Sequence, residues 1–496
     1  MSHSSLTGEK KPSPPPEPMY KPHEKVYPKA VSGFFRTFKW RIMALTLAIY
    51  YLTPWIRWDR GEGQPDQAIL VDLANRRFYF FMVEIWPQEF YYVAGLLVMA
   101  GVGLFLITST VGRAWCGYFC PQTVWTDLYL HVERYIEGDR NAQIRLDKQP
   151  WGAEKIRKRG SKHGIFLLIA LLTGGAWVFY FADAPTLAMQ LVTGEAPFAA
   201  YGAIAVLTFT TYALGGLMRE QVCIYMCPWP RIQAAMLDDN SLTVTYHDWR
   251  GEPRGKHRKG SEASSLGDCI DCNMCVQVCP TGVDIRDGQQ LGCITCGLCI
   301  DACDTVMEKV GYQTGLIGYS TLADYDESTK RKSHVAMSLK RFFRPRTILY
   351  FGGWSLIGAA ILVSLFVRDR LDVTIQHDRN PQFVTLSDGG VRNGYTVKIL
   401  NMRLAERFFA VSLEGLPGAT MKLAGDHKAP ATELFISAPA DAVKELKVYV
   451  TQPKGDIASS RQGVIFHVDE LTGTEEATYN AVFHAPDRYD FDLRGP

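Results

Sequence analysis

Residues 269–280 have the sequence CIDCNMCVQVCP, and residues 293–303 have the sequence CITCGLCIDAC. The two stretches share the spacing Cys-x-x-Cys-x-x-Cys-x-x-x-Cys and hold eight of the twelve cysteines in the 496-residue chain. The other four cysteines form two pairs nearer the N-terminus, and none follows Cys303. Cysteines gathered in this way are typical of metal or redox sites, whereas disulfides stabilise small secreted domains.

The spacing of both stretches is that of bacterial ferredoxins with two 4Fe–4S clusters. Three thiolates with two residues between neighbours let a single loop wrap three irons of one cluster, and the fourth cysteine of each run ligates the other cluster. The pattern therefore predicts two 4Fe–4S clusters. We expect one cluster on Cys269, Cys272, Cys275 and Cys303, and the second on Cys293, Cys296, Cys299 and Cys279.

Zinc is the alternative occupant, because Cys-x-x-Cys pairs also bind zinc. Two complete runs at ferredoxin spacing favour iron–sulfur clusters. One departure from the pattern is Asp304, which follows the second run where a proline is usual. This change leaves the ligands in place.

The remaining cysteines repeat a second motif. Cys116-Gly-Tyr-Phe-Cys120-Pro121 and Cys223-Ile-Tyr-Met-Cys227-Pro228 both follow an apolar stretch, which indicates a duplicated two-helix unit. Each proline suits the first turn of a new helix, such as residues 122–137, whose start would stabilise a thiolate. Together the four thiolates, Cys116, Cys120, Cys223 and Cys227, would suit copper(I) or a dithiol/disulfide couple. Buried structural cysteines are the alternative, and a nearby His131 is more simply structural.

Five apolar stretches are long enough to cross a hydrocarbon core as helices, which takes about 20 residues. They are approximately Trp40–Trp58, Tyr91–Gly112, Gly164–Ala182, Ala199–Leu217 and Thr347–Val367. Pro54 interrupts the first of them. The sequence therefore predicts a four-span membrane domain over residues 40–218 and a fifth span over residues 347–367.

The positions of Lys and Arg predict the orientation in a bacterial inner membrane. The connection between the second and third stretches is rich in both residues, whereas residues 183–198 contain neither. Because basic loops stay in the cytoplasm, we expect a disordered cytoplasmic tail over residues 1–39 and a cytoplasmic ferredoxin-like domain over residues 219–346. Residues 368–496 would then lie in the periplasm.

Residues 368–496 change to short alternating stretches separated by Gly, Pro and Asp. Strands are predicted at Tyr395–Leu400, Phe408–Leu413, Glu433–Ile436, Lys447–Val450 and Val464–Val468. This spacing favours an antiparallel β-sandwich of immunoglobulin type. The scattered His377, His427, His467 and His484, with Met402 and Met421, are interpreted as ordinary surface or packing residues rather than copper ligands.

Other classes of function find no support. A net charge of +2 gives no electrostatic case for nucleic acid. The pair Gly101-Val-Gly103 lies inside a predicted span and lacks the third glycine of a dinucleotide fingerprint.

The ordered combination of paired Cys-x-x-x-Cys-Pro motifs, two ferredoxin runs and a C-terminal sandwich resembles the CcoG/FixG family of cytochrome c oxidase accessory proteins, also called RdxA. The resemblance implies reduction of Cu(II) to Cu(I) during assembly of a cbb3-type oxidase, with Cys116, Cys120, Cys223 and Cys227 binding or reducing the ion. It also implies copper chaperones and the oxidase assembly machinery as partners. The membrane half is similar to NapH-type quinol dehydrogenases as well.

Three hypotheses follow. The first is an oxidoreductase that reduces copper for oxidase assembly, with an unidentified electron donor. The second is a quinol-linked electron-transfer subunit, and the third is a non-catalytic scaffold whose sandwich docks oxidase subunits. The cysteine motifs favour the first.

Overall fold

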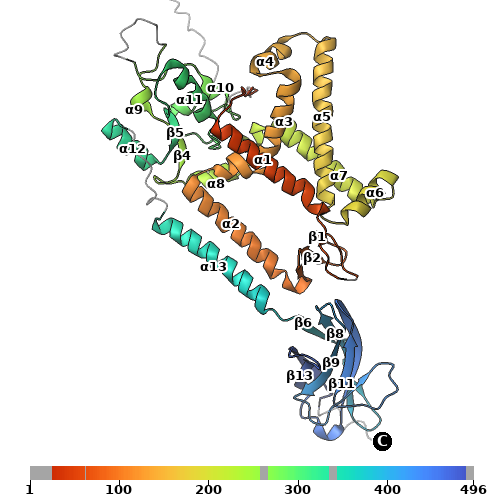
Figure 1. The fold of residues 1–496 in the computed structure, drawn as a ribbon. Helices are drawn as coiled ribbons and strands as arrows, with labels where there is room; N and C mark the ends of the chain where they lie inside the picture. Colours follow the sequence, from red (N-terminus) through yellow and green to blue (C-terminus); the bar gives the residue numbers. More distant parts are fainter. Residues whose placement is uncertain (1–24, 62, 257–265, 334–342, 488–496) are drawn as a thin grey trace, which may run out of the picture. The chain divides into compact units, whose positions relative to one another are not determined.

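The computed structural model describes residues 25–61, 63–256, 266–333 and 343–487. The chain divides into two compact units, residues 1–359 and residues 360–496. The first unit contains long apolar helices and the cysteine-rich segment, and the second is built mainly of strands (Figure 1). The predicted combination of helical membrane part, ferredoxin-like segment and all-β domain matches this arrangement.

Five helices of the described chain overlap the five predicted spans. They are α1 (Phe34–Leu52), α2 (Tyr91–Val111), α5 (Ala153–Val178), α7 (Phe198–Thr211) and α13 (Pro345–Val367). Four segments of the described chain are long and apolar enough to cross a bilayer, namely Pro87–Val111, Ala153–Val178, Phe198–Met218 and Pro345–Val367. They match four of the five predicted spans. Helix α1 is not among them, because Arg36, Lys39 and Arg41 stand within its 19 residues, so the count of five spans is not confirmed.

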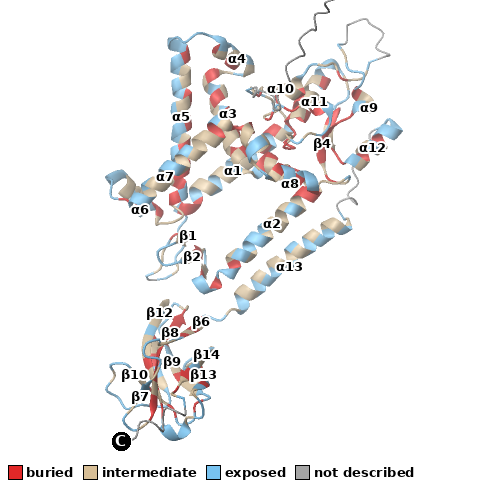
Figure 2. Ribbon diagram, turned by 180° about the vertical axis from the view of Figure 1, so that it is seen from behind, coloured by how far each residue is buried: buried red, intermediate tan, exposed pale blue. Residues whose placement is uncertain are grey.

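The spans leave apolar surface uncovered by protein. None of the 23 residues of α13 is buried (Figure 2), as expected of a helix that faces lipid. Where spans touch, glycines allow close approach. A Cβ atom at Gly103 of α2 would lie 3.2 Å from Nε1 of Trp354 on α13. One at Gly174 of α5 would lie 2.9 Å from the carbonyl oxygen of Ile204 on α7.

Shorter elements connect the spans. They include α3 (Pro121–Glu137), α4 (Arg140–Lys148), α6 (Ala184–Thr193) and α8 (Trp229–Met236). Helix α3 confirms the helix predicted over residues 122–137. Before α2, the strands β1 (Ile69–Asp72), β2 (Arg77–Phe80) and β3 (Val83–Ile85) form an antiparallel sheet. The sequence analysis did not predict this sheet, whose strands have only three or four residues each.

The cysteine-rich segment is a small α+β structure. Strands β4 (Thr243–Tyr246) and β5 (Ile317–Ser320) pair antiparallel, and the helices are α9 (Asp248–Gly251), α10 (Met274–Gln277), α11 (Leu298–Val310) and α12 (Leu322–Arg331). Helix α10 begins within the first cysteine run and α11 within the second. The two runs thus share a loop-then-helix form, which agrees with their shared spacing.

The stretch before α1 corrects one prediction. Of the tail predicted to be disordered over residues 1–39, residues 1–24 lie outside the described part of the chain. Residues 25–39 are ordered: the amide of Lys29 donates to the carbonyl of Gln277 at 2.7 Å. The Asp301 carboxylate on α11 accepts from the amides of Phe35 at 3.2 Å and Arg36 at 2.7 Å. A helix start needs acceptors for its free amides, and here the acceptor is 265 positions away in sequence.

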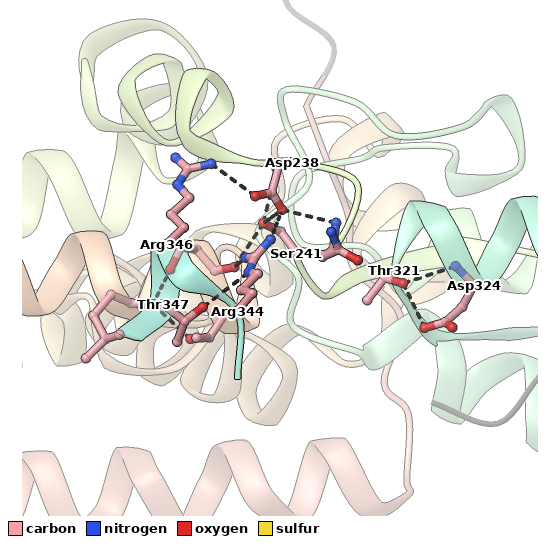
Figure 3. A network of polar contacts seen from close by, with 11 residues as sticks. Asp238, Ser241, Thr321, Asp324, Arg344, Arg346 and Thr347 are labelled. Atoms are coloured by element: carbon pink, nitrogen blue, oxygen red, sulfur yellow. Dashed lines mark hydrogen bonds and ion pairs between the residues drawn. The ribbon is translucent and has the colours of Figure 1, made fainter. Parts of the chain in front are cut away.

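A polar network fixes the cysteine-rich segment to the ends of α2 and α13 (Figure 3). The Asp238 carboxylate accepts from Arg344 and, at 3.1 Å, from Arg346, both at the start of α13. The Ser241 hydroxyl donates to the carbonyl of Ser109 near the end of α2 at 3.0 Å, and Arg344 donates to the same carbonyl. The loop between α8 and β4 is therefore held against two spans.

The second unit is a sandwich of two antiparallel sheets. One has the order β10–β12–β8–β6, with β7 paired to β8, and the other has the order β11–β9–β13–β14. The strands are β6 (Leu371–His377), β7 (Val384–Thr385), β8 (Val391–Asn401), β9 (Arg407–Glu414), β10 (Thr420–Leu423), β11 (Leu434–Ala438), β12 (Ala442–Gln452), β13 (Arg461–Glu470) and β14 (Glu476–His484). The five predicted strands correspond to β8, β9, β11, β12 and β13. Side chains such as Tyr395, Phe409 and Phe466 are fully buried between the sheets.

Candidate functional site

The eight cysteines of the two runs separate into two neighbouring groups. Cys303 interacts electrostatically with Cys275, Cys272 and Cys269, whereas Cys299 interacts with Cys296, Cys293, Cys279 and, least, Cys275. Burial raises the pKa of the Cys303 thiol to about 12, and the neighbouring cysteines add to the rise. Buried thiols of this kind ionise when a metal centre binds them. The assignment of four particular cysteines to each cluster stays a prediction.

The surroundings of these groups fit iron–sulfur clusters. One cavity is lined by Cys275, Cys279, Cys293, Cys296 and Cys299. The hydroxyl of Thr295 is buried and has no hydrogen-bond partner among the described residues. Because cluster sulfurs accept hydrogen bonds, an unpartnered donor between two ligand cysteines suits a bound cluster.

A single metal ion fits less well. Thiolates around one tetrahedral ion lie within about 4 Å of one another, since metal–sulfur bonds are about 2.3 Å long. Among the residues that the structure describes, no three His, Cys, Asp or Glu side chains form a group that could hold one ion. The described cysteines of the ferredoxin runs are therefore not arranged as an assembled zinc site.

The other four cysteines, the cysteine quartet, lie at two π-helical turns at the ends of spans, with Cys116 and Cys223 inside the turns and Cys120 and Cys227 directly after them. Trp115–Phe119 forms the turn that precedes α3, and Val222–Met226 forms the turn that precedes α8. Such turns are rare and occur often at functional sites. Pro121 occupies the first position of α3, as predicted.

The quartet members interact with one another. Burial raises the pKa of the Cys116 thiol to about 12, and Cys120, Cys223 and Cys227 add to the rise. Burial likewise raises the pKa of Cys223 to about 12. Both thiols lie inside the turns rather than at the helix starts, where Cys120 and Cys227 stand, so the stabilisation of thiolates by helix starts stays a prediction. In addition, Sγ of Cys116 lies 3.2 Å from Oε1 of the buried Gln233.

The first quartet turn rests directly on the second cysteine run. A Cβ atom at Gly117 would lie 2.7 Å from the carbonyl oxygen of Ile294 and 3.3 Å from Cα of Cys296. The Tyr118 hydroxyl donates to the carbonyl of Cys296 at 2.9 Å. We call Cys279, Cys293, Cys296 and Cys299 the proximal group, and Cys269, Cys272, Cys275 and Cys303 the distal group. Cys272 of the distal group is exposed.

Buried charged residues surround the quartet, and the sequence analysis did not identify them. On α3, the Asp127 carboxylate is held by Arg36 through two hydrogen bonds of 2.8 and 2.9 Å. Further along α3, Oε2 of Glu133 lies 2.9 Å from Nη2 of Arg219. These ion pairs could have been predicted from the acidic residues of α3 together with the basic residues that precede or follow the spans.

The isolated histidines do not join the quartet. The ring of His131 packs edge-on against Trp40 with centroids 4.9 Å apart. In the second unit the rings of His377 and His484 have centroids 4.9 Å apart, while His467 pairs with Glu414 at 2.8 Å. Met421 is fully buried in the sandwich core.

Comparison with known proteins supports the two-part organisation. Residues 218–322 match the family model described as a 4Fe-4S dicluster domain, residues 93–134 match one described as a 4Fe-4S binding domain, and residues 361–486 match the IG-like fold at the C-terminal of FixG. The match over residues 93–134 includes Cys116 and Cys120 of the quartet.

Three relatives match over nearly the whole chain. The nitrogen fixation protein FixG of Rhizobium meliloti is 57% identical, covering 95% of this chain and 94% of its own. Protein RdxB of Cereibacter sphaeroides is 53% identical over 94% of this chain and 97% of its own. Protein RdxA of the same organism is 51% identical over 94% of this chain and 99% of its own.

Proposed function

The chain belongs to the FixG/RdxA family, and we propose that it reduces Cu(II) to Cu(I) at the cysteine quartet for the assembly of a cbb3-type cytochrome c oxidase. The chain is a membrane-bound iron–sulfur oxidoreductase that transfers electrons. The proposal adds the substrate and the biological purpose. It also places the first unit's cysteine-rich segment on the cytoplasmic side of the inner membrane and the sandwich in the periplasm.

The contact between the quartet and the proximal group supports the proposal most directly. Gly117 and Tyr118 of the first quartet turn touch the loop from Ile294 to Cys296. Clusters held by the two groups would each supply one-electron transfer. Redox centres joined by packed protein in this way suit transfer of single electrons, and conversion of Cu(II) to Cu(I) takes one electron per ion.

The chemistry of the quartet suits the reduced ion. Thiolate is a soft ligand and prefers Cu(I) over Cu(II), so four thiolates lower the free energy of the product. Handing copper to a chaperone would require the four thiolates to bind the ion transiently and to release it. The exposed Cys272 places the distal group at the surface, where an electron donor protein could dock.

The decisive experiment uses the purified full-length chain with its clusters reduced anaerobically by dithionite, followed by removal of the excess reductant. Addition of Cu(II) with a Cu(I)-specific indicator should give one Cu(I) for each electron released, while the cluster absorbance recovers. Changing Cys116, Cys120, Cys223 and Cys227 together to Ser should abolish Cu(I) formation and leave cluster absorbance intact. Unchanged Cu(I) formation in that variant would reject the quartet as the copper site.

Iron analysis gives an independent outcome. Two 4Fe–4S clusters correspond to about eight irons per chain, and the quartet variant should keep all of them. About twelve irons in the unaltered chain, falling to eight in the quartet variant, would show that the quartet holds a third cluster. That result would contradict copper binding at the quartet.

A further inference from the structure

Two buried cations lie near the proximal group and the quartet. Arg113 follows α2 and is 5% exposed, and Lys39 lies in α1 and is 3% exposed. Cationic side chains are seldom buried so completely unless a partner compensates their charge. Arg113 donates to the backbone of Cys293 in the proximal group, and Lys39 lines a small cavity together with Cys223 of the quartet.

Arg113 connects Cys116 with Cys293. Its guanidinium donates to the carbonyl of Cys293 at 3.1 Å, to the carbonyl of Leu291, and to the carbonyl of Pro230 at 2.8 Å. Cys116 lies three positions further along the chain and is near enough for the positive charge of Arg113 to act on its thiol, as it does on Cys293. All three acceptors are uncharged carbonyl groups. Within the described residues no carboxylate pairs with Arg113, so its positive charge is not cancelled locally.

Lys39 connects Cys223 with Cys296. A small cavity is lined by Lys39, Cys223 and Ile294, together with Asp127, Arg219 and Glu220. The ammonium lies 3.9 Å from Oδ1 of Asp127, but both oxygens of that carboxylate are already bound by Arg36. Its positive charge acts on the thiols of both Cys223 and Cys296.

The two copies of the cysteine motif show why Arg113 and Lys39, rather than two arginines at matching positions, lie near the quartet. Arg219 precedes the second quartet turn as Arg113 precedes the first, yet Arg219 pairs with Glu133 at 2.9 Å. The charge of Arg219 is therefore compensated by α3. Lys39 instead is the cation that lies beside Cys223. It belongs to α1, whose first amides donate to Asp301.

We infer that Arg113 and Lys39 are positioning residues that tune electron transfer between the proximal group and the quartet. Every electron that reaches either centre adds a negative charge to a buried site, and a nearby cation lowers the free energy of that charge strongly where the dielectric is low. The net charge around a cluster is one of the quantities that set its reduction potential. This inference extends the proposed function. The part of it that concerns the quartet rests on the proposed reduction of copper there.

The test measures reduction potentials of the full-length protein by redox titration with EPR detection, in the absence of copper. Lys39→Met keeps the length of the aliphatic stem but removes the charge, and it should lower the midpoint potential of one of the two clusters while the other stays unchanged. Lys39→Arg should restore the potential. Lys158→Met, which removes an exposed lysine paired with Glu154 on α5, should shift neither cluster.

Arg113 supplies a second, independent pair of variants. Arg113→Met should lower the same potential, whereas Arg113→Lys keeps the charge and should hold it near the original value even though carbonyl hydrogen bonds are lost. Unchanged potentials in both methionine variants, with full iron content, would overturn the inference. Equal potentials in Lys39→Arg and Lys39→Met would also overturn the inference. That result would show that the shape of the side chain, and not its charge, sets the potential.

Copper assays then separate this inference from the proposed function. If the unaltered protein reduces Cu(II), Lys39→Met should change the rate of that reduction, because the charge of Lys39 acts on both the donor and the acceptor of the electron. If the unaltered protein does not reduce Cu(II) while Lys39→Met still lowers one cluster potential, the proposed function fails and the tuning of the proximal group stands.

Discussion

Glu133 on α3 shows how single residues hold the membrane-surface part together. The carboxylate is fully buried, yet it lies 2.9 Å from Arg219 and 3.1 Å from Lys162. Burial alone would raise the pKa of Glu133, but Arg219 and Lys162 outweigh burial and lower the pKa to about 2. Ion pairs therefore hold α3 against Lys162 of α5 and against Arg219 in the segment after α7.

Glu133→Gln should destabilise the folded protein by about 3–5 kcal/mol, because it leaves two buried cations short of one counter-charge. A group with a lowered pKa contributes stability above its unfolded-state pKa of 4.5, and the contribution is lost only as the pH falls toward 2. The loss of thermal stability in detergent should therefore be the same at pH 5 and at pH 8.

Glu154→Gln is the matched control for this change. Glu154 makes the same kind of contact, with Lys158 at 2.7 Å, but on the exposed surface of α5, where such pairs contribute little. It should leave the unfolding temperature unchanged. A Glu133→Gln effect that has disappeared by pH 5 would show that Glu133 is already protonated there, with a pKa raised by burial, contrary to the pairing described.

Among the elements, the first quartet turn is the one whose backbone must approach another element closely. Gly117→Ala would place a methyl group 2.7 Å from the carbonyl oxygen of Ile294. Backbone atoms move only at a high cost in free energy. We therefore expect the folded protein to lose about 1–3 kcal/mol of stability and the turn to be displaced. Cu(II) reduction by the pre-reduced protein should slow, whereas the iron content should remain that of the unaltered chain.

Gly160→Ala provides the comparison for Gly117→Ala, because a Cβ atom at Gly160 of α5 meets no atom within 4 Å. Alanine favours a helix over glycine by about 1 kcal/mol, so this variant should be as stable as the original or slightly more so. Equal copper reduction rates in the two variants would mean that the contact of Gly117 with Ile294 does not matter for electron transfer.

The elements also show what a sequence can and cannot predict. The cysteine groups, the four apolar spans and the helix after Pro121 were predictable because spacing, hydropathy and proline act over neighbouring residues. The order of residues 25–39 was not, since the acceptor for the first amides of α1 is Asp301 on α11. Likewise Arg113 and Lys39 acquire their place beside the cysteines only through contacts between distant segments.

At the scale of the whole molecule, the two units have separate hydrophobic cores. The core of the sandwich is formed only by residues between Leu371 and Ala485, and every cysteine belongs to the first unit. Deleting residues 369–496 should therefore leave cluster absorbance, iron content and Cu(II) reduction in vitro close to those of the full chain. Activity measured on the purified truncated protein checks this expectation.

The truncation also separates the reductase from the scaffold hypothesis. A reductase keeps electron transfer in vitro without the sandwich, although delivery to an oxidase in cells could still need it. Loss of the iron–sulfur absorbance on truncation would contradict the independence of the two cores. A soluble sandwich expressed alone from residue 368 should unfold cooperatively as a single domain.

The cap that Asp301 places on α1 has a consequence for biosynthesis. Arg36 leaves the ribosome 265 residues before Asp301 does, and at about 5–20 residues per second that interval lasts roughly 13 to 53 seconds. Throughout it, the first turn of α1 has no acceptor from α11. Because Asp301 stands inside the second cysteine run, any disorder of that run before its clusters are inserted would leave the first turn of α1 without this acceptor as well.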